Sequence, residues 1–138
     1  MKIQNTTFPK EFEIEDFKNW TFELSDFQKW SIYGLKNNKN IIITAHTGSG
    51  KTLPAEWTFI HFIMKEKKKI IYTAPTKALC NEKFNKFSMK YPQVNFGIHT
   101  GDTQYNPNAD CLIMTTEVLR NNLYKKFLLD GNPELKKR

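Results

Sequence analysis

A strand-like run followed at once by a glycine-rich loop constrains this chain more than any other feature. Residues 41–44, three isoleucines and a threonine, form a short β-branched run that predicts a buried strand. The loop of residues 45–52 follows and ends in Lys51 and Thr52. A helix is predicted to begin near Gly50, and one of its faces carries apolar residues at helical spacing: Leu53, Trp57, Ile60 and Met64. Strand, loop and helix in this order predict a loop that cradles phosphate groups.

The loop has the chemistry that a nucleoside triphosphate requires. Gly48 and Gly50 permit backbone angles that a side chain would forbid, so successive N–H groups can point at phosphate oxygens. Lys51 would reach the β- and γ-phosphates and the Thr52 hydroxyl would ligate Mg²⁺, which makes these two the candidate catalytic side chains and ATP with Mg²⁺ the predicted ligand. The alternative is a glycine–serine turn with an incidental lysine. The candidate nucleotide-binding residues of the loop are Ala45, Thr47, Gly48, Ser49, Gly50, Lys51 and Thr52.

The rest of the chain repeats the alternation of strand and helix. Ser25 can cap a helix that runs to about Leu35. Further apolar runs predict strands at residues 70–73, 94–99 and 111–115. Two more helices are predicted from apolar residues at helical spacing: Cys80, Phe84, Phe87 and Tyr91 in the first, and Leu119, Leu123 and Phe127 in the second. The predicted fold class is therefore α/β, a three-layer parallel sheet with ligands at the carboxyl ends of its strands.

Composition and charge narrow the class of protein. The 138 residues suit a single domain, and a hydrophobic fraction of 39% is enough to fill a core. The longest apolar runs are too short to span a bilayer, so no membrane partner is predicted, and no apolar signal segment follows Met1. The formal net charge of +7 favours polyanions such as nucleic acid, although solubility alone explains such an excess equally well.

The two cysteines, Cys80 and Cys111, have a spacing that fits no metal-binding pattern and make no disulfide framework. The favoured interpretation is a pair of reduced core thiols in an intracellular protein, against a redox role. The residues do not distinguish the cytoplasm from the nucleus, and they leave a viral origin open.

Four stretches of sequence, taken in order, resemble one family of proteins. They are residues 22–28, 45–52, 73–79 and 97–102, the last continued by residues 106–120. Together they resemble superfamily-two RNA helicases of the DExH type, above all the exosome-associated, superkiller-like group. Ala45 departs from the glycine common at the first loop position but is familiar in helicases. The resemblance implies a partial RecA-like P-loop NTPase domain over residues 21–138, behind an N-terminal extension of residues 1–20.

By this resemblance, two residues ahead of the loop would contact the adenine base. Gln28 would read its edge, because a side-chain amide both donates and accepts hydrogen bonds. Phe22 would stack near the base. Local alternatives stay open: Ser25 and Gln28 have the spacing of a capping box, and Phe22 is equally well a core aromatic residue.

The resemblance also implies contacts to the backbone of single-stranded RNA after three of the strands. Threonine hydroxyls, backbone N–H groups and lysine can hold phosphates without reading bases. The implied contact residues are Pro75, Thr76, Lys77, Thr100, Gly101, Thr115 and Thr116. Thr116 is alternatively a simple helix N-cap, and the preference for RNA over DNA rests on the resemblance alone. Trp20, Trp30 and Trp57 are expected to pack in the core rather than to stack on bases.

One feature of such helicases does not occur among the 138 residues, namely the acidic Asp-Glu-x-His box that holds Mg²⁺ and positions water. Asp130 and Glu134 lie in a predicted turn and tail and do not replace it. A second RecA-like domain, which supplies an arginine finger, is expected as a partner. The chain therefore resembles the front part of a first motor domain, which binds ATP and RNA but needs those groups for hydrolysis and unwinding. The alternative is a non-enzymatic nucleotide- or RNA-binding module that acts with a separate chain.

Overall fold

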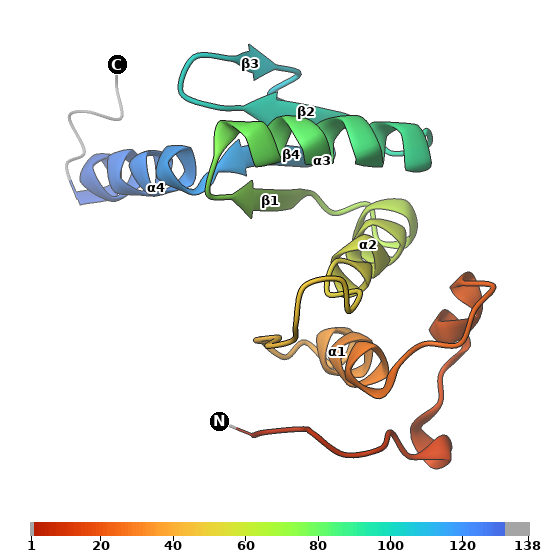
Figure 1. Ribbon diagram of the computed structural model, residues 1–138. Helices are drawn as coiled ribbons and strands as arrows, with labels where there is room; N and C mark the ends of the chain where they lie inside the picture. Colours follow the sequence, from red (N-terminus) through yellow and green to blue (C-terminus); the bar gives the residue numbers. More distant parts are fainter. Residues whose placement is uncertain (1, 132–138) are drawn as a thin grey trace. The chain divides into compact units, whose positions relative to one another are not determined.

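The computed structural model describes residues 2–131 and divides into two compact units, Met1–Thr58 and Phe59–Arg138 (Figure 1). The first unit contains two 3₁₀ turns, Lys10–Phe12 and Glu15–Asn19. They are followed by helices α1 (Asp26–Lys36) and α2 (Leu53–Thr58), and the described part of this unit has no strand.

Helix α1 begins where the sequence predicts. The backbone N–H of Ser25 donates to Oε1 of Gln28 at 2.9 Å, an interaction that belongs to a capping box. N-terminal residues pack on this helix, since the Phe8 ring lies 4.8 Å from the ring of Trp30 and 5.7 Å from that of Tyr33. The predicted N-terminal extension therefore contributes aromatic side chains to the packing of the first unit.

A buried carboxylate ties together three segments of the first unit. Asp16 is 6% exposed; its Oδ1 accepts from Nζ of Lys36 at 2.7 Å, and its Oδ2 accepts from the indole N–H of Trp57 at 2.8 Å. Trp57 is fully buried, which confirms that it packs in the core rather than offering a stacking surface. Asp16 thereby joins the N-terminal extension to the end of α1 and to α2.

Two predictions for the first unit are wrong. Residues 41–44 form no strand, and Ile42 is 85% exposed. A strand exists only where a neighbour satisfies its backbone N–H and C=O groups, and a β-branched run cannot supply that neighbour by itself. The helix after the loop begins at Leu53 rather than near Gly50, because Lys51 and Thr52 continue the loop as a turn.

The second unit opens with a π-helix, Phe59–Lys65. Hydrogen bonds in such a helix span one residue more than those of an α-helix, so the spacing of residues on one face changes. Phe59 and Ile63 are buried as a result, whereas Ile60 and Met64 are only partly buried. Ile60 and Met64 still pack against the core, so the predicted apolar face is confirmed in part, with Phe59 and Ile63 as its most buried residues.

A four-stranded sheet forms the centre of the second unit (Figure 1). Its strands, in chain order, are β1 (Ile70–Ala74), β2 (Phe96–His99), β3 (Gln104–Tyr105) and β4 (Cys111–Thr115). The order across the sheet is β1-β4-β2-β3, with β1, β4 and β2 parallel and β3 antiparallel to β2. The three strands predicted for this unit are confirmed, and the mostly parallel sheet confirms the α/β fold class of an incomplete RecA-like domain.

Strand β3 was not expected from the sequence, and it depends on a glycine in β2. A Cβ at Gly97 would lie 2.1 Å from the carbonyl oxygen of Asn106 and 2.9 Å from that of Tyr105. Only glycine lets the returning chain approach β2 so closely. A lone glycine inside an apolar run is the single sequence signal for this close approach.

Helix α3 (Lys77–Lys90) packs against β1, β2 and β4. Cys80 and Phe87 are fully buried, as their helical spacing predicts. Phe87 meets the Phe59 ring edge-on, with 5.0 Å between the ring centroids, and stacks against Phe96 of β2. These aromatic contacts make one core between the helix and the sheet, which fixes where α3 begins relative to the strand ends.

Helix α4 (Thr116–Gly131) matches its predicted apolar face only in part. Val118 is buried near its start, but Leu123 is 58% exposed, because the apolar residues are spread around the helix rather than gathered on one face. The side chains of Phe127 and Asp130, and all of residues 132–138 with Glu134, lie outside the described residues. Within residues 2–131, no helix is long and apolar enough to cross a membrane.

Candidate functional site

The glycine-rich loop of residues 45–52 is held by its own atoms. Gly48 and Gly50 have φ of 85° and 88°, the left-handed conformation for which glycine is suited. The His46 carbonyl accepts from the Ser49 N–H at 3.2 Å and from the Ser49 hydroxyl at 2.6 Å. A Cβ at Gly48 would meet no atom within 4 Å, so the space beside this glycine is open. The loop is therefore turned as predicted, with room for a ligand on one side.

Lys51 folds back onto the loop that carries it. Its Nζ donates to the carbonyl oxygen of Ala45 at 2.7 Å, and the residue is exposed. The next residue, Thr52, is partly buried, and its carbonyl accepts from the Glu56 N–H at 3.0 Å in α2. A phosphate oxygen is a stronger acceptor for an ammonium group than a carbonyl oxygen. The Lys51 ammonium is thus held by the loop and not by the helix that begins at Leu53.

Gln28 uses both ends of its side-chain amide inside the protein. Besides the bond from Ser25 to its Oε1, its Nε2 donates to the carbonyl oxygen of Gly50 at 3.1 Å. The capping role left open by the sequence is confirmed, and the second bond ties α1 to the loop. Adenine recognition by Gln28 stays a prediction. Phe22 is 54% exposed, so the core alternative for this ring is wrong.

Three loops of the second unit meet at one edge of the sheet. Strands β1, β4 and β2 are parallel neighbours, so the segments that follow Ala74, Thr115 and His99 leave the same edge. After β1, Pro75, Thr76 and Lys77 are exposed. Thr76 is the N-cap of α3, since its Oγ1 accepts from the Leu79 N–H at 3.2 Å. The segments that carry the predicted nucleic-acid contacts of this unit therefore lie at the same end of the parallel strands.

The loop after β2 presents its backbone and an acidic side chain rather than its first threonine. Thr100 is 2% exposed, and its N–H donates to the Thr103 carbonyl at 2.8 Å. Its hydroxyl donates to Oδ1 of Asp102 at 3.3 Å, while Oδ2 of Asp102 accepts from Nζ of Lys77 at 2.5 Å. The Lys77 ammonium lowers the pKa of the Asp102 carboxyl. Asp102 lies within residues 97–102, one of the stretches that resemble helicases, but its ion pair with Lys77 was not predicted from the sequence.

At the junction of β4 with α4, the cap interaction is made by Thr115 rather than by Thr116. The Thr115 hydroxyl accepts from the Val118 N–H at 3.4 Å, and Thr115 is 8% exposed. Thr116 is exposed and is the first residue of α4. The cap interaction therefore belongs to Thr115, and the alternative of Thr116 as the N-cap is wrong. The reason is that β4 and α4 follow one another directly, which leaves the last strand residue in the capping position.

Both cysteines are fully buried free thiols. Burial raises the pKa of the Cys111 thiol to about 12 and also raises that of Cys80. Both thiols are therefore protonated and unreactive at neutral pH, as expected for core cysteines. In residues 2–131, no group of three or more His, Cys, Asp or Glu residues is arranged to hold a metal ion.

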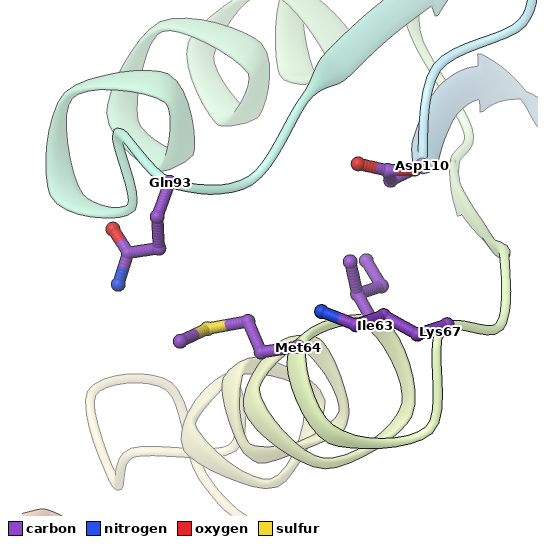
Figure 2. Close-up of a pocket in the computed structure, with 5 residues that line it drawn as sticks. All are labelled: Ile63, Met64, Lys67, Gln93 and Asp110. Atoms are coloured by element: carbon purple, nitrogen blue, oxygen red, sulfur yellow. The ribbon is translucent and has the colours of Figure 1, made fainter.

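Figure 2 shows a pocket of the second unit that lies away from these loops. Its lining residues are Ile63, Met64, Lys67, Gln93 and Asp110. Asp110 comes directly before β4, and Lys67 lies a few residues before β1, so the pocket is at the amino ends of the strands. The three loops lie at the carboxyl ends, and the pocket is therefore not part of the candidate site.

Comparison with known proteins places these loops in a family context. A model of the DEAD/DEAH box helicase family matches residues 25–135. The antiviral helicase SKI2 of Saccharomyces cerevisiae is 47% identical over 108 residues, which is 78% of this chain and 8% of that protein. The exosome RNA helicase MTR4 of Homo sapiens is 42% identical and the DExH-box ATP-dependent RNA helicase DExH9 of Arabidopsis thaliana 43%, each over 108 residues. Those matches cover 78% of this chain, and 10% and 11% of the two relatives. All three relatives are eukaryotic, which gives no support to a viral origin.

Proposed function

Because this chain belongs to the DEAD/DEAH box helicase family, we propose that it functions as part of an ATP-dependent RNA helicase. It binds ATP with Mg²⁺ through residues 45–52 and binds the backbone of single-stranded RNA through the loops after β1, β2 and β4. The main support for the nucleotide site is the conformation of the loop. Two of its glycines are left-handed, and the ammonium of its lysine donates to a loop carbonyl.

The residues of the loop fit a magnesium-bound triphosphate. The open space beside Gly48 leaves room for phosphate oxygens, and the exposed Lys51 ammonium supplies a positive charge that can move to them. The Thr52 hydroxyl would hold Mg²⁺, which neutralises phosphate charge when bound. Phe22 and Gln28 would contact the adenine, and the second N–H of the Gln28 amide nitrogen can donate to the base while the first remains bonded to the Gly50 carbonyl.

The strand-end loops fit a phosphate backbone better than they fit bases. Their exposed residues include Thr76, Lys77, Gly101 and Thr116, which offer hydroxyl, ammonium and backbone donors. A net charge of +7 attracts a polyanion to such a surface. Binding should then depend steeply on salt and little on base sequence.

Hydrolysis and unwinding would also need an acidic box and an arginine from a second motor domain, as in related P-loop enzymes. None of the 138 residues forms an Asp-Glu-x-His box. We therefore expect the 138-residue chain to bind ATP without turning it over. Steady ATP turnover that Lys51→Ala abolishes would instead show that this chain has a hydrolytic group of its own. If the chain binds nucleotide or RNA only together with a separate chain, the alternative of a non-enzymatic module is the better account.

The nucleotide site is tested by titrating a fluorescent ATP analogue with and without Mg²⁺. Lys51→Ala should weaken binding about tenfold to a hundredfold, because an ionic hydrogen bond to phosphate is lost. Thr52→Ala should remove the dependence on Mg²⁺. Lys39→Ala is the matched control, since it removes an exposed lysine of the same unit from another loop and should bind like the unaltered chain. Unchanged affinity in Lys51→Ala would show that the loop is not the nucleotide site.

The RNA surface is tested by measuring single-strand binding between about 50 and 200 mM salt. Lys77→Gln should weaken binding and reduce the slope of log affinity against log salt by about one, because one phosphate contact is lost. Oligonucleotides of different sequence should bind alike, and matched DNA strands show whether the 2′-hydroxyl contributes. Binding that does not weaken as salt rises would contradict the backbone model.

A further inference from the structure

The lysine proposed to bind phosphate already has an anionic partner within its own chain. Nζ of Lys77 lies 2.5 Å from Oδ2 of Asp102, and the two side chains are 50% and 68% exposed. The other carboxylate oxygen accepts from the Thr100 hydroxyl. The pKa of Asp102 is lowered, first of all by its bond to Lys77, so the carboxylate is ionised at neutral pH.

This ion pair joins the loops on either side of a central strand. Lys77 follows β1 and Asp102 follows β2, while β4 lies between those two strands in the sheet. Thr115 and Thr116 stand at the carboxyl end of β4. The pair therefore links two of the three loops proposed to contact RNA, and it does so across the position of the third.

The pair is suited to exchange. An exposed ion pair stabilises a fold weakly, by at most about fivefold in an equilibrium constant. A phosphate presents the same charge and the same kind of acceptor oxygens as a carboxylate. The space beside this turn is open, because Gly101 next to Asp102 is exposed and a Cβ there would meet nothing within 4 Å.

Resting on the RNA-binding function proposed above, we propose that Asp102 is an internal phosphate mimic that limits RNA affinity. In the free protein it occupies the ammonium group of Lys77, and an RNA phosphate must displace it. Displacement leaves the Asp102 carboxylate beside the phosphate, so its negative charge opposes binding both before and after exchange. The affinity for single-stranded RNA is then set below what Lys77 alone would give.

A positioning role makes the opposite prediction. If Asp102 served to aim the Lys77 ammonium at an incoming phosphate, its removal would weaken binding, because the lysine would lose its preferred orientation. The sign of the change on neutralising Asp102 therefore separates the two roles. Asp102→Asn keeps an acceptor for the Thr100 hydroxyl, so the turn itself is preserved.

The experiment measures binding of a fluorescent oligouridylate to the full 138-residue chain by anisotropy over a series of salt concentrations. Asp102→Asn should bind about threefold to tenfold more tightly at low salt, and its salt slope should be steeper by about one. In a Lys77→Gln background the same change should have much less effect, because the carboxylate acts mainly through Lys77. Asp102→Ala should repeat the gain and so show that it does not depend on the asparagine side chain.

Glu66→Gln is the matched control. Glu66 also pairs with a lysine, Lys68 at 2.9 Å, and its pKa is likewise lowered, first of all by that bond. It lies before β1, at the opposite end of the strand from Lys77. Removing its charge raises the net charge by the same amount and should change RNA affinity less than about twofold, since the five residues of β1 span roughly 16 Å, which exceeds a Debye length of about 8 Å.

Several results of this experiment would overturn the proposal. Weaker or unchanged binding in Asp102→Asn, while the unaltered chain binds RNA through Lys77, overturns the mimic and leaves the proposed function standing. An equal gain in Glu66→Gln, or an undiminished gain in the Lys77→Gln background, shows a general charge effect and overturns it too. If no variant binds RNA, both the mimic and the proposed RNA surface are wrong. If the unaltered chain binds RNA independently of Lys77, the lysine is misassigned and the mimic falls with it.

Discussion

The glycine-rich loop of the first unit and the strand-end loops of the second are both proposed to hold phosphate, yet they are built differently. The glycine-rich loop is shaped by bonds among its own residues and by Gln28, and its lysine is bonded to Ala45. The strand-end loops are positioned by a sheet whose register pairs Ala74 with Thr115 and His99 with Met114. One site is thus arranged mainly by the loop's own hydrogen bonds with one bond from Gln28, and the other by the pairing of strands in a sheet.

This difference indicates which interactions each site must change when it binds phosphate. In the glycine-rich loop, a phosphate must replace hydrogen bonds that the loop makes to itself. At the strand ends, the sheet has already fixed where each loop leaves, and only the exposed side chains need to adjust. Changes that disturb the sheet should therefore damage the second site most, whereas the first should respond to the residues that brace its helices.

The sequence supplies a separate probe for each region. All three tryptophans, Trp20, Trp30 and Trp57, lie in the first unit, and both cysteines, Cys80 and Cys111, lie in the second. Tryptophan fluorescence therefore reports unfolding of the first unit. Buried thiols react only when their surroundings open, so thiol reactivity reports unfolding of the second.

The largest effect is expected from Gly97→Ala in β2. The new methyl group would meet the carbonyl oxygens of Asn106 and Tyr105, which belong to the backbone and cannot turn aside. Such overpacking should lower the free energy of unfolding of the second unit by about 3 kcal/mol. The measurement is the urea concentration at which Cys80 and Cys111 become reactive.

Gly101→Ala is the control for this change. A Cβ at Gly101 meets nothing within 4 Å, so the stability should change by less than about 0.5 kcal/mol. If the two alanine variants were equally stable, the close approach of β3 to β2 would be incorrect. If Gly97→Ala shifted tryptophan fluorescence as strongly as thiol reactivity, the two units would unfold together and the contrast between them would lose its basis.

A smaller effect is expected from Asp16→Asn in the first unit. Oδ1 of Asp16 accepts from Lys36 and Oδ2 from Trp57, and the amide that replaces the carboxylate cannot pair ionically with the lysine. Loss of a hydrogen bond to a charged group in a largely buried site should lower the free energy of unfolding by about 2 kcal/mol. Tryptophan fluorescence during urea unfolding measures this change.

Glu13→Gln provides the comparison, because Glu13 also pairs with a lysine of α1, Lys29 at 2.9 Å, but its own side chain is 47% exposed. Exposed pairs contribute little, so this variant should differ from the unaltered chain by less than about 0.5 kcal/mol. Equal losses in the two variants would mean that Asp16 does not brace the first unit through its buried position.

The sequence predicted best those elements whose residues carry a local signal. The apolar run at residues 111–115 is strand β4, and the spacing of Ser25 and Gln28 does form a capping box. The run at residues 41–44 has the same character as β4 but forms no strand. Residues 111–115 form a strand because β1 and β2 pair with them on either side. The composition of a segment does not specify such neighbours.

The features that the sequence did not reveal depend on residues far apart in the chain. Gly97 meets Asn106 nine positions on, and Lys77 pairs with Asp102 twenty-five positions on. Neither contact follows from a periodic pattern in the sequence. The Lys77–Asp102 pair could be predicted only from the order of the strands in the sheet. The π-helix at Phe59–Lys65 was not predicted either, because its apolar residues are also compatible with the spacing of an α-helix.

The smallest effect concerns two exposed threonines of the second site, Thr76 and Thr116. The Thr76 hydroxyl accepts from the Leu79 N–H and is itself exposed, so Thr76→Ala should lower stability through the cap alone, by about 1 kcal/mol. Thr116→Ala removes an exposed hydroxyl from the first residue of α4 and should be nearly neutral, since alanine favours a helix. Thiol reactivity in urea measures both. If the contrast between the regions is right, neither change alters nucleotide affinity, although both weaken RNA binding. An RNA effect in Thr76→Ala alone would mean that the cap positions Lys77 and that Thr116 does not touch the phosphate backbone.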